Sequence, residues 1–297
     1  MSATSQIRRR QNRAGLLFTL PFMAIFALML LVPLVYAGYI STYQNTLVAG
    51  VRFSGIANYV QAFTDPLFLH GLARMGLFLV VQVPIMLGLA LLIALALDSG
   101  RVKGAKAVRL LAFMPYAVPG VVATLMWGYL YGDDFGPIAQ VSRAVGLGSP
   151  HLLGDSSMLG SIMNVVTWEY VGYNMVIMYS ALRAIPGELY EAAAIDGAGA
   201  IRTALSIKIP NIRNAIMLTV IFSIIGTFQL FNEPSLMRNL NPSAIDAAYT
   251  PNFYAYNLAF VNQDVNYAAA IAFALGVFIA IISYIVQLST SRKEVAR

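Results

Sequence analysis

The stretch GELYEAAAIDGAGAIRTALSIKIP occupies residues 187–210 and lies between two runs that are apolar enough to sit in lipid. Helix-favouring residues fill its first part, and Gly197 can adopt the left-handed backbone conformation that ends a helix. The helical pattern resumes from Thr203 to Ile209, and Pro210 is expected to stop it because proline has no backbone N–H to donate. The segment therefore predicts a helix, a sharp turn and a second helix.

The composition of the whole chain indicates a membrane protein. Of its 297 residues, 59% are hydrophobic and 11% are charged, whereas soluble domains are about 45–50% apolar and about 25% charged. The chain has no cysteine, which excludes a disulfide framework, a thiol nucleophile and a thiolate metal site. Its net charge of +6 does not indicate nucleic-acid binding, because the basic residues fall in short loops beside apolar runs and form no solvated patch with stacking groups.

Six apolar runs are each long enough to cross a bilayer core, which needs about 20 residues of helix. They cover residues 16–40, 76–97, 107–131, 158–182, 214–233 and 266–290. The connections between them are too short for a separate soluble domain, and the chain has no visible internal repeat. We therefore expect an all-α membrane protein with six transmembrane helices in a single domain that covers residues 1–297.

The basic residues predict how these helices are oriented. With a cytoplasmic N-terminus, 15 of the 19 Lys and Arg residues lie on cytoplasmic segments, and the outside segments hold only Arg52, Arg74, Arg143 and Arg238. Cytoplasmic loops of membrane proteins carry such an excess of Lys and Arg. Both termini and the loop at 187–213 are therefore expected in the cytoplasm.

Periodicity alone leaves the role of this loop open, because a helix lying at the lipid headgroups would show a similar pattern, although its polar face is not basic. The order of its residues, however, resembles the EAA loop of ABC importer permeases: Glu191-Ala192-Ala193, then Asp196-Gly197-Ala198, then Ile207, Ile209 and Pro210. In that family the loop forms the coupling helices that dock on a cytoplasmic ATPase. The resemblance assigns ATPase docking to Glu188, Glu191, Ala192, Ala193, Asp196, Gly197, Ala198, Ile207 and Pro210.

The resemblance extends over nearly the whole chain and points to the sugar-permease branch, which includes the maltose and glycerol-phosphate importers. Phe53–Tyr59 resembles the first external loop of that branch, Phe228–Glu233 the segment after the docking loop, and Tyr254–Phe260 the approach to the last span. The chain departs from many relatives at Asn239–Pro242, where they have Gly-Gly-Pro, and at Arg74, where they have a polar amide.

The resemblance implies a type I ABC importer, with this chain as one half of a heterodimeric pore in the cell (inner or plasma) membrane. The partners that it implies are a second homologous permease subunit, two copies of a cytoplasmic ABC ATPase, an extracytoplasmic solute-binding protein, membrane lipid, and a sugar, oligosaccharide or polyol as substrate. The chain has no Gly-x-x-x-x-Gly-Lys-Ser/Thr motif, which nucleotide-binding loops of this kind need. We therefore expect it to bind no cofactor, to be no enzyme itself, and to depend on ATP hydrolysis by its partner.

Polar residues within the apolar runs predict a substrate pathway at mid-membrane depth. Glu169 lies near the middle of its run, where an ionisable side chain usually faces the protein interior or a wet cavity. Polar and aromatic neighbours share about half of the helix circumference with it, and a second polar set ends the fifth run. The predicted pathway residues are Thr167, Glu169, Tyr170, Tyr173, Asn174, Gln229, Asn232 and Glu233. Two roles for Glu169 stay open, as a substrate ligand or as a strut that pairs with the sister subunit.

Two other classes of protein compete with this interpretation. A self-sufficient secondary transporter of a small polar solute would need an inverted repeat or half-helices at a coupling-ion site. A membrane-embedded enzyme would need a paired carboxylate or a metal cluster, whereas Glu169 stands alone in its run and His70 and His151 lie alone in loops. Pro115 and Pro119, one turn apart, predict a broken third span that flexes during gating.

Overall fold

The computed structural model describes the backbone of residues 3–46 and 50–295 and the side chains of residues 15–46 and 50–288. The basic side chains expected at the cytoplasmic termini lie outside that described part; they are Arg8, Arg9, Arg10, Arg13, Arg292, Lys293 and Arg297.

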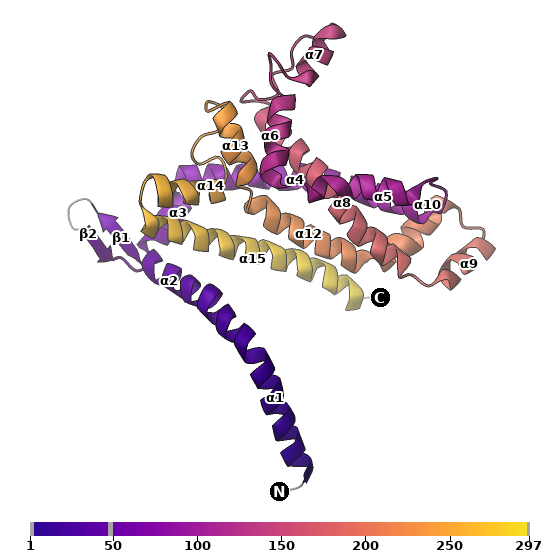
Figure 1. The fold of residues 1–297 in the computed structure, drawn as a ribbon, viewed down its shortest axis with the longest axis horizontal. Coiled ribbons are helices and arrows are strands. Elements are labelled where there is room, and N and C mark those ends of the chain that lie inside the picture. The colour runs from indigo at the N-terminus through magenta and orange to yellow at the C-terminus, as the bar shows by residue number, and fades with distance from the viewer. Residues whose placement is uncertain (1–2, 47–49, 296–297) are drawn as a thin grey trace.

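The body of the protein is a bundle built from α4 (Pro66–Asp98), α8 (Met158–Arg183), α12 (Arg213–Phe228) and α15 (Val265–Val295). These helices lie side by side, with α4 packed along α8 and α12 against both α4 and α15 (Figure 1). The interior between them is apolar because each helix contributes large buried hydrophobic side chains. The core includes Met75, Phe78, Ile162, Val165 and Phe228.

The N-terminal arm leaves the bundle. It consists of α1 (Ala3–Phe26), the π-helical η1 (Ala27–Leu31) and α2 (Val32–Ser41), and α1 diverges from the other helices (Figure 1). Large apolar side chains along the arm, from Leu16 to Tyr39, are exposed. The arm contacts the bundle through α2, which packs on α15, whereas the exposed apolar surface of α1 and η1 needs lipid or another protein to cover it.

Two short strands correct the expectation of an all-α protein. After α2 the chain forms β1 (Tyr43–Thr46) and β2 (Gly50–Phe53), which pair antiparallel with Tyr43 opposite Phe53. The side-chain amide of Asn58, in α3 (Ala57–Thr64), donates to the carbonyl oxygens of Ser41 and Tyr43 at 2.8 and 2.7 Å. This hairpin is too short and too polar to have stood out from the neighbouring loop in the sequence.

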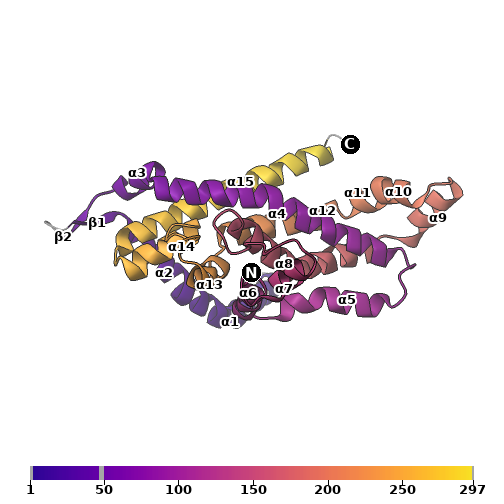
Figure 2. The ribbon, with the colours of Figure 1, turned by 90° about the horizontal axis from the view of Figure 1, so that it is seen from above.

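The third predicted span is broken, as its two prolines predicted. Helix α5 (Ala105–Phe113) is followed by the 3₁₀ turn η2 (Met114–Ala117) and by α6 (Gly120–Leu130), which is bent by 97° from the α5–η2 segment. Figure 1 shows α6 leaving the bundle together with α13 (Asn232–Leu240), and α7 (Pro137–Ala144) lies beyond α6. Figure 2 shows α5 alongside α8.

Two other boundaries differ from the predicted spans. Helix α4 begins at Pro66 and not at residue 76, because Asp65 caps it: the backbone N–H of Leu67 donates to Asp65 Oδ1 at 2.9 Å. Arg74 therefore lies within α4. Helix α12 ends at Phe228 and not at residue 233, and the chain then turns into α13.

The external side of this bundle, in the predicted orientation, is closed by the segment between α13 and α15. It contains α14 (Pro251–Tyr256) and the π-helical η4 (Asn257–Val261). The hydroxyls of Tyr254 and Tyr267 donate to Asp65 Oδ2 at 2.7 and 2.8 Å. One carboxylate therefore fastens the start of α4 to both α14 and α15.

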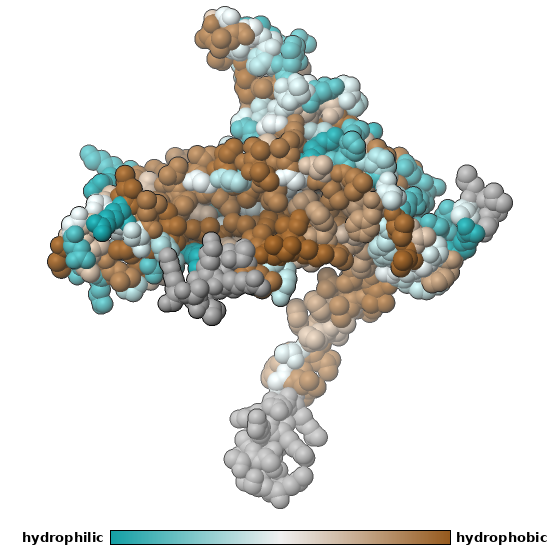
Figure 3. All heavy atoms as spheres, turned by 180° about the vertical axis from the view of Figure 1, so that it is seen from behind, coloured by the Kyte–Doolittle hydropathy of each residue, from teal (hydrophilic) through white to brown (hydrophobic). Residues whose placement is uncertain are grey.

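Within the described residues, three helices are long and apolar enough to cross a membrane by themselves: Gly15–Ser41, Pro66–Asp98 and Val265–Leu288. Two bent pairs, Ala105–Ala117 with Gly120–Leu130 and Ala200–Asn211 with Arg213–Phe228, raise that number to five. Helix α8 is not among them because its polar side chains interrupt the apolar run. Figure 3 shows hydrophobic residues over the middle of the bundle and hydrophilic residues toward its ends.

Candidate functional site

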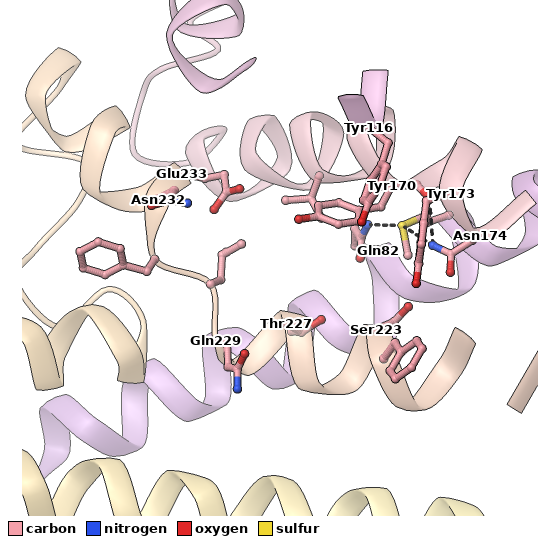
Figure 4. Close-up of a pocket in the computed structure, with 16 residues that line it drawn as sticks. Gln82, Tyr116, Tyr170, Tyr173, Asn174, Ser223, Thr227, Gln229, Asn232 and Glu233 are labelled. Atoms are coloured by element: carbon pink, nitrogen blue, oxygen red, sulfur yellow. Dashed lines mark hydrogen bonds between the residues drawn. The ribbon is translucent and has the colours of Figure 1, made fainter. Parts of the chain in front are cut away.

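A cavity of about 460 Å³ lies between α4, α8 and α12 and the turn that follows α12. Its lining mixes aromatic rings with amide, hydroxyl and carboxylate groups (Figure 4). The polar and tyrosine side chains of the lining are Gln82, Tyr116, Tyr170, Tyr173, Asn174, Ser223, Thr227, Gln229, Asn232 and Glu233. Six of the eight residues predicted for the pathway are in this set, and Thr167 and Glu169 are not.

Three tyrosines form one wall of the cavity. Tyr170 and Tyr173 come from α8, and Tyr116 comes from the 3₁₀ turn between α5 and α6. The ring of Tyr116 stacks on that of Tyr173, with centroids 4.6 Å apart and planes 23° from parallel, and meets Tyr170 edge-on at 5.8 Å. The break after α5 therefore brings an aromatic ring into the cavity, which the sequence did not predict for Tyr116.

Gln82 also enters the site unpredicted. This buried amide lies in α4, and its Nε2 donates to Thr167 Oγ1 at 3.1 Å, while that hydroxyl donates to the carbonyl oxygen of Met163 at 2.7 Å. Thr167 therefore lies behind Gln82 and holds it. A lone amide inside the apolar run of α4 was the signal in the sequence that could have identified Gln82.

The turn after α12 supplies the remaining polar groups. Gln229 follows the end of α12, whereas Asn232 and Glu233 begin α13, so these side chains do not end a single span at residue 233 as predicted. They still reach the same cavity because the turn is held in place: Thr250 Oγ1 donates to the carbonyl oxygen of Leu230 and Asn252 Nδ2 to that of Gln229, both at 2.8 Å.

Ser223 and Thr227 of α12 face the cavity as well. Ser223 Oγ also donates to the carbonyl oxygen of Thr219 at 2.8 Å. The Ser223 hydroxyl is therefore satisfied within its own helix and still faces the cavity.

Glu169 is buried beside the cavity, with 5% of its surface exposed, and its Oε2 has no hydrogen-bond partner among the described residues. A Cβ placed on Gly120 would lie 3.3 Å from Glu169 Oε1 and 4.0 Å from Asn232 Nδ2. The carboxylate therefore lies against the first turn of α6, where a negative charge is favourable, and close to the start of α13.

The loop at 187–210 has the predicted helix, turn and second helix. Helix α9 (Gly187–Ile195) ends in Gly197, which has φ +68°. The N–H of Gly197 donates to the carbonyl oxygen of Ala194 at 3.1 Å and that of Ala198 to Ala193 at 2.9 Å, which is the hydrogen-bond pattern of a glycine-terminated helix.

The second half of the loop does not stop at Pro210 as predicted. It runs through α10 (Ala200–Thr203), the π-helical η3 (Ala204–Lys208) and α11 (Ile209–Asn211), and it breaks at Ile212 with a bend of 68° into α12. The missing N–H of Pro210 is accommodated by a wider turn, in which Ile209 N–H donates to the carbonyl oxygen of Ala204.

The surface of the loop combines carboxylates with exposed apolar side chains. Glu188, Glu191, Ala192, Asp196, Gly197 and Pro210 are exposed, Ala198 and Ile207 are half-buried, and Ala193 is buried. Ile195, Ile201 and Leu205 are 87%, 77% and 62% exposed. Apart from the buried Ala193, the predicted docking residues therefore lie on a surface that contains apolar groups without cover from this chain.

Comparison with known proteins identifies the chain's relatives. The family described as "Binding-protein-dependent transport system inner membrane component" matches residues 1–295. The chain is 28% identical to the lactose transport system permease of Rhizobium radiobacter over 96% of both chains. It is 30% identical to the diacetylchitobiose uptake system permease of Streptomyces coelicolor, covering 90% of this chain and 80% of that one.

The fold has a counterpart in a crystal structure of a bacterial ABC transporter that is involved in the import of the acidic polysaccharide alginate. The two chains are 19% identical and superpose with a TM-score of 0.80, covering 97% of this chain and 99% of the other. The predicted resemblance to ABC importer permeases is thus confirmed, and the alternative of a self-sufficient transporter is set aside. The chain belongs to the binding-protein-dependent transport system inner membrane components, the multi-pass, non-catalytic permease subunits of ABC importers.

Proposed function

We propose that this permease forms half of a heterodimeric pore of type I, crosses the membrane six times with both termini in the cytoplasm, and imports a neutral sugar, oligosaccharide or polyol. Three long apolar helices, the α5–α6 pair and the α12 half of the second bent pair supply five spans, and α8, at the centre of the bundle, supplies the sixth. The excess of Lys and Arg on one set of loops supports the orientation.

A second permease subunit accounts for the surfaces that this chain leaves uncovered. The N-terminal arm exposes apolar side chains along its whole described length, and lipid and a sister subunit together would cover them. The chain presents one docking loop, whereas two ATPases need two. ATP hydrolysis belongs to those ATPases because the chain has no phosphate-binding motif.

The lining of the cavity supports a sugar as the solute. Flat tyrosine rings suit the C–H faces of a sugar ring, and the amides, hydroxyls and carboxylate around them suit its hydroxyls. The relatives named for lactose, diacetylchitobiose and arabinooligosaccharides agree with this chemistry.

The same lining disfavours an anion such as glycerol phosphate, for which other relatives are named. Glu233 lines the cavity and no lysine or arginine does so among the described residues. Helix α4 does include one basic residue, Arg74. However, Arg74 Nη1 donates to the carbonyl oxygen of Tyr249 at 2.6 Å, and its guanidinium lies 4.1 Å from the centre of that ring. Its charge is therefore directed away from the cavity.

The tyrosine wall beside Glu233 is the observation that carries this proposal. It is tested by uptake into proteoliposomes that contain the complete complex with ATP inside, using radiolabelled lactose, diacetylchitobiose, an arabinooligosaccharide and sn-glycerol 3-phosphate. We expect uptake of a neutral member of this set, reduced by Tyr173→Ala. The assignment of a neutral sugar as substrate would be overturned if only glycerol phosphate were taken up, or if Tyr173→Ala left uptake unchanged.

A further inference from the structure

A buried ion pair joins the docking loop to the pore. Lys208 Nζ lies 2.6 Å from Asp98 Oδ2, and the two side chains are only 14% and 3% exposed. Lys208 ends the π-helical turn of the loop, and Asp98 is the last residue of α4. A charge pair that is removed from water in this way is held in one geometry and tolerates the loss of one partner poorly.

The first half of the loop is fastened to the same pair. The ring of Tyr190, in α9, lies with its centre 5.1 Å from Lys208 Nζ, a distance at which an ammonium group is attracted to an aromatic face. Side chains from α9, from the second half of the loop and from α4 therefore meet at one point. We name Asp98, Lys208 and Tyr190 the loop–α4 clamp.

Helix α4 connects this clamp to the cavity. It is a single helix from Pro66 to Asp98, and Gln82 and Met86 on it line the cavity. Met86 and Asp98 are separated by about 18 Å along the axis at 1.5 Å per residue. Pro84 lies between Gln82 and Met86 and leaves the carbonyl of Val80 without its helical donor. Helix α4 is thus continuous from the clamp to the cavity and has its weak point at the cavity wall.

We propose that the loop–α4 clamp transmits movement of the docking loop to the cavity, with the Pro84–Asp98 part of α4 moving as a lever that pivots at Pro84. Asp98 and Lys208 are positioning residues: they do not line the cavity, and through this part of α4 they set the position of Met86 on the cavity wall. Ile212, which is buried against α4 with Leu97 and Ala94, holds the end of the loop but leaves α9 free. The clamp is what makes α9 follow α4. The part of this inference that concerns ATP rests on the proposed function.

The mechanical link is tested on the full chain in lipid nanodiscs, without any ATPase. Because the chain has no cysteine, Leu92→Cys and Ala194→Cys introduce a unique pair for spin labels, on α4 and on α9, at exposed positions. We expect a narrow distance distribution that broadens in Lys208→Met/Asp98→Asn. This double variant leaves no unpaired buried charge, so it keeps the fold. The control is Lys103→Met, which removes an exposed charge from the neighbouring loop. An unchanged distribution in the double variant overturns the clamp.

The coupling role is tested in the complete complex through ATP hydrolysis. We expect the stimulation of hydrolysis by the solute-binding protein to fall by about fivefold or more in the double variant, the lower limit of typical coupling between sites, while assembly is unchanged. The exchanged pair Asp98→Lys/Lys208→Asp should restore the stimulation of ATP hydrolysis. The coupling role is overturned if the double variant shows a broadened label distribution and yet normal stimulation of ATP hydrolysis. If the wild-type chain binds no ATPase, the proposed function is contradicted instead. The nanodisc measurement would still test the mechanical link, because it uses no ATPase.

Discussion

The carboxylate of Glu169 lies against the backbone of Gly120, so close that a Cβ on Gly120 would stand 3.3 Å from Glu169 Oε1. This contact joins the middle of α8 to the start of α6, and a Cβ at residue 120 would make it tighter than most contacts of this kind. Glu169 therefore faces the break between α5 and α6, and Glu233 is the carboxylate that lines the cavity.

The two carboxylates should consequently respond differently to neutralisation. We expect Glu233→Gln to change the apparent KM for solute uptake and Glu169→Gln to leave it nearly unchanged, because only Glu233 reaches the solute. Uptake kinetics of both variants in proteoliposomes, with assembly checked by size-exclusion chromatography, measure this. The opposite result would make Glu169 the substrate ligand, and a failure of Glu169→Gln to assemble would support its role as a strut.

Gly172 should be the least replaceable glycine of α8. A Cβ there would overlap the carbonyl oxygen of Ala112, because α5 packs on α8 at this point. We expect Gly172→Ala to destabilise the protein by at least about 1–3 kcal/mol, which is the typical cost of overpacking a core. Thermal unfolding in detergent measures this.

Gly160 of the same helix is the matched control, since a Cβ on it meets nothing within 4 Å. We expect Gly160→Ala to be neutral or to stabilise by up to about 1 kcal/mol, the difference between glycine and alanine in a helix. Equal unfolding temperatures for both variants would refute the close approach of α5.

The turn at Gly197 should be required for ATPase binding. Its φ of +68° is disfavoured by about 1–2 kcal/mol for residues with a Cβ, and more for a β-branched residue, so Gly197→Val should displace α9 and reduce co-purification of the ATPase. Gly199, with φ −69° and no neighbour within 4 Å, supplies the control: Gly199→Val should bind the ATPase normally. Normal binding by Gly197→Val would show that this turn is not part of the docking surface.

The stack of Tyr116 on Tyr173 should contribute to solute affinity. Removing one ring by Tyr116→Ala should raise the KM for uptake by about fivefold, since an aromatic contact is worth about 1 kcal/mol. Tyr116→Phe keeps the stacking surface and is expected to have a much smaller effect. If the two variants raise KM equally, the hydroxyl and not the ring makes the contribution.

The sequence predicted those features that depend on local pattern. The turn at Gly197 and the break at Pro115 and Pro119 follow from the conformational limits of glycine and proline, and the polar arc of α8 follows from helical spacing. The boundaries that were wrong depend on contacts between distant segments. Helix α12 ends early because Thr250 and Asn252 hold the following turn.

Two features, one in the cavity and one at the docking loop, could not have been predicted from the sequence. Tyr116 reaches the cavity only because α6 is bent by 97° from α5, and a bend angle is not encoded in residue spacing. The ion pair of Asp98 with Lys208 joins residues 110 positions apart, and nothing in the local pattern of either residue indicates the other.

The central claim is that this chain is one half of a pore that two ATPases drive through two docking loops. Native mass spectrometry of the complex, purified through this chain from its own membranes, tests it most directly. The account predicts one copy of this chain, one copy of a different homologous permease and two copies of an ABC ATPase, and loss of the ATPase in Gly197→Val. A stable assembly of this chain that contains no ATPase and no second permease would contradict it.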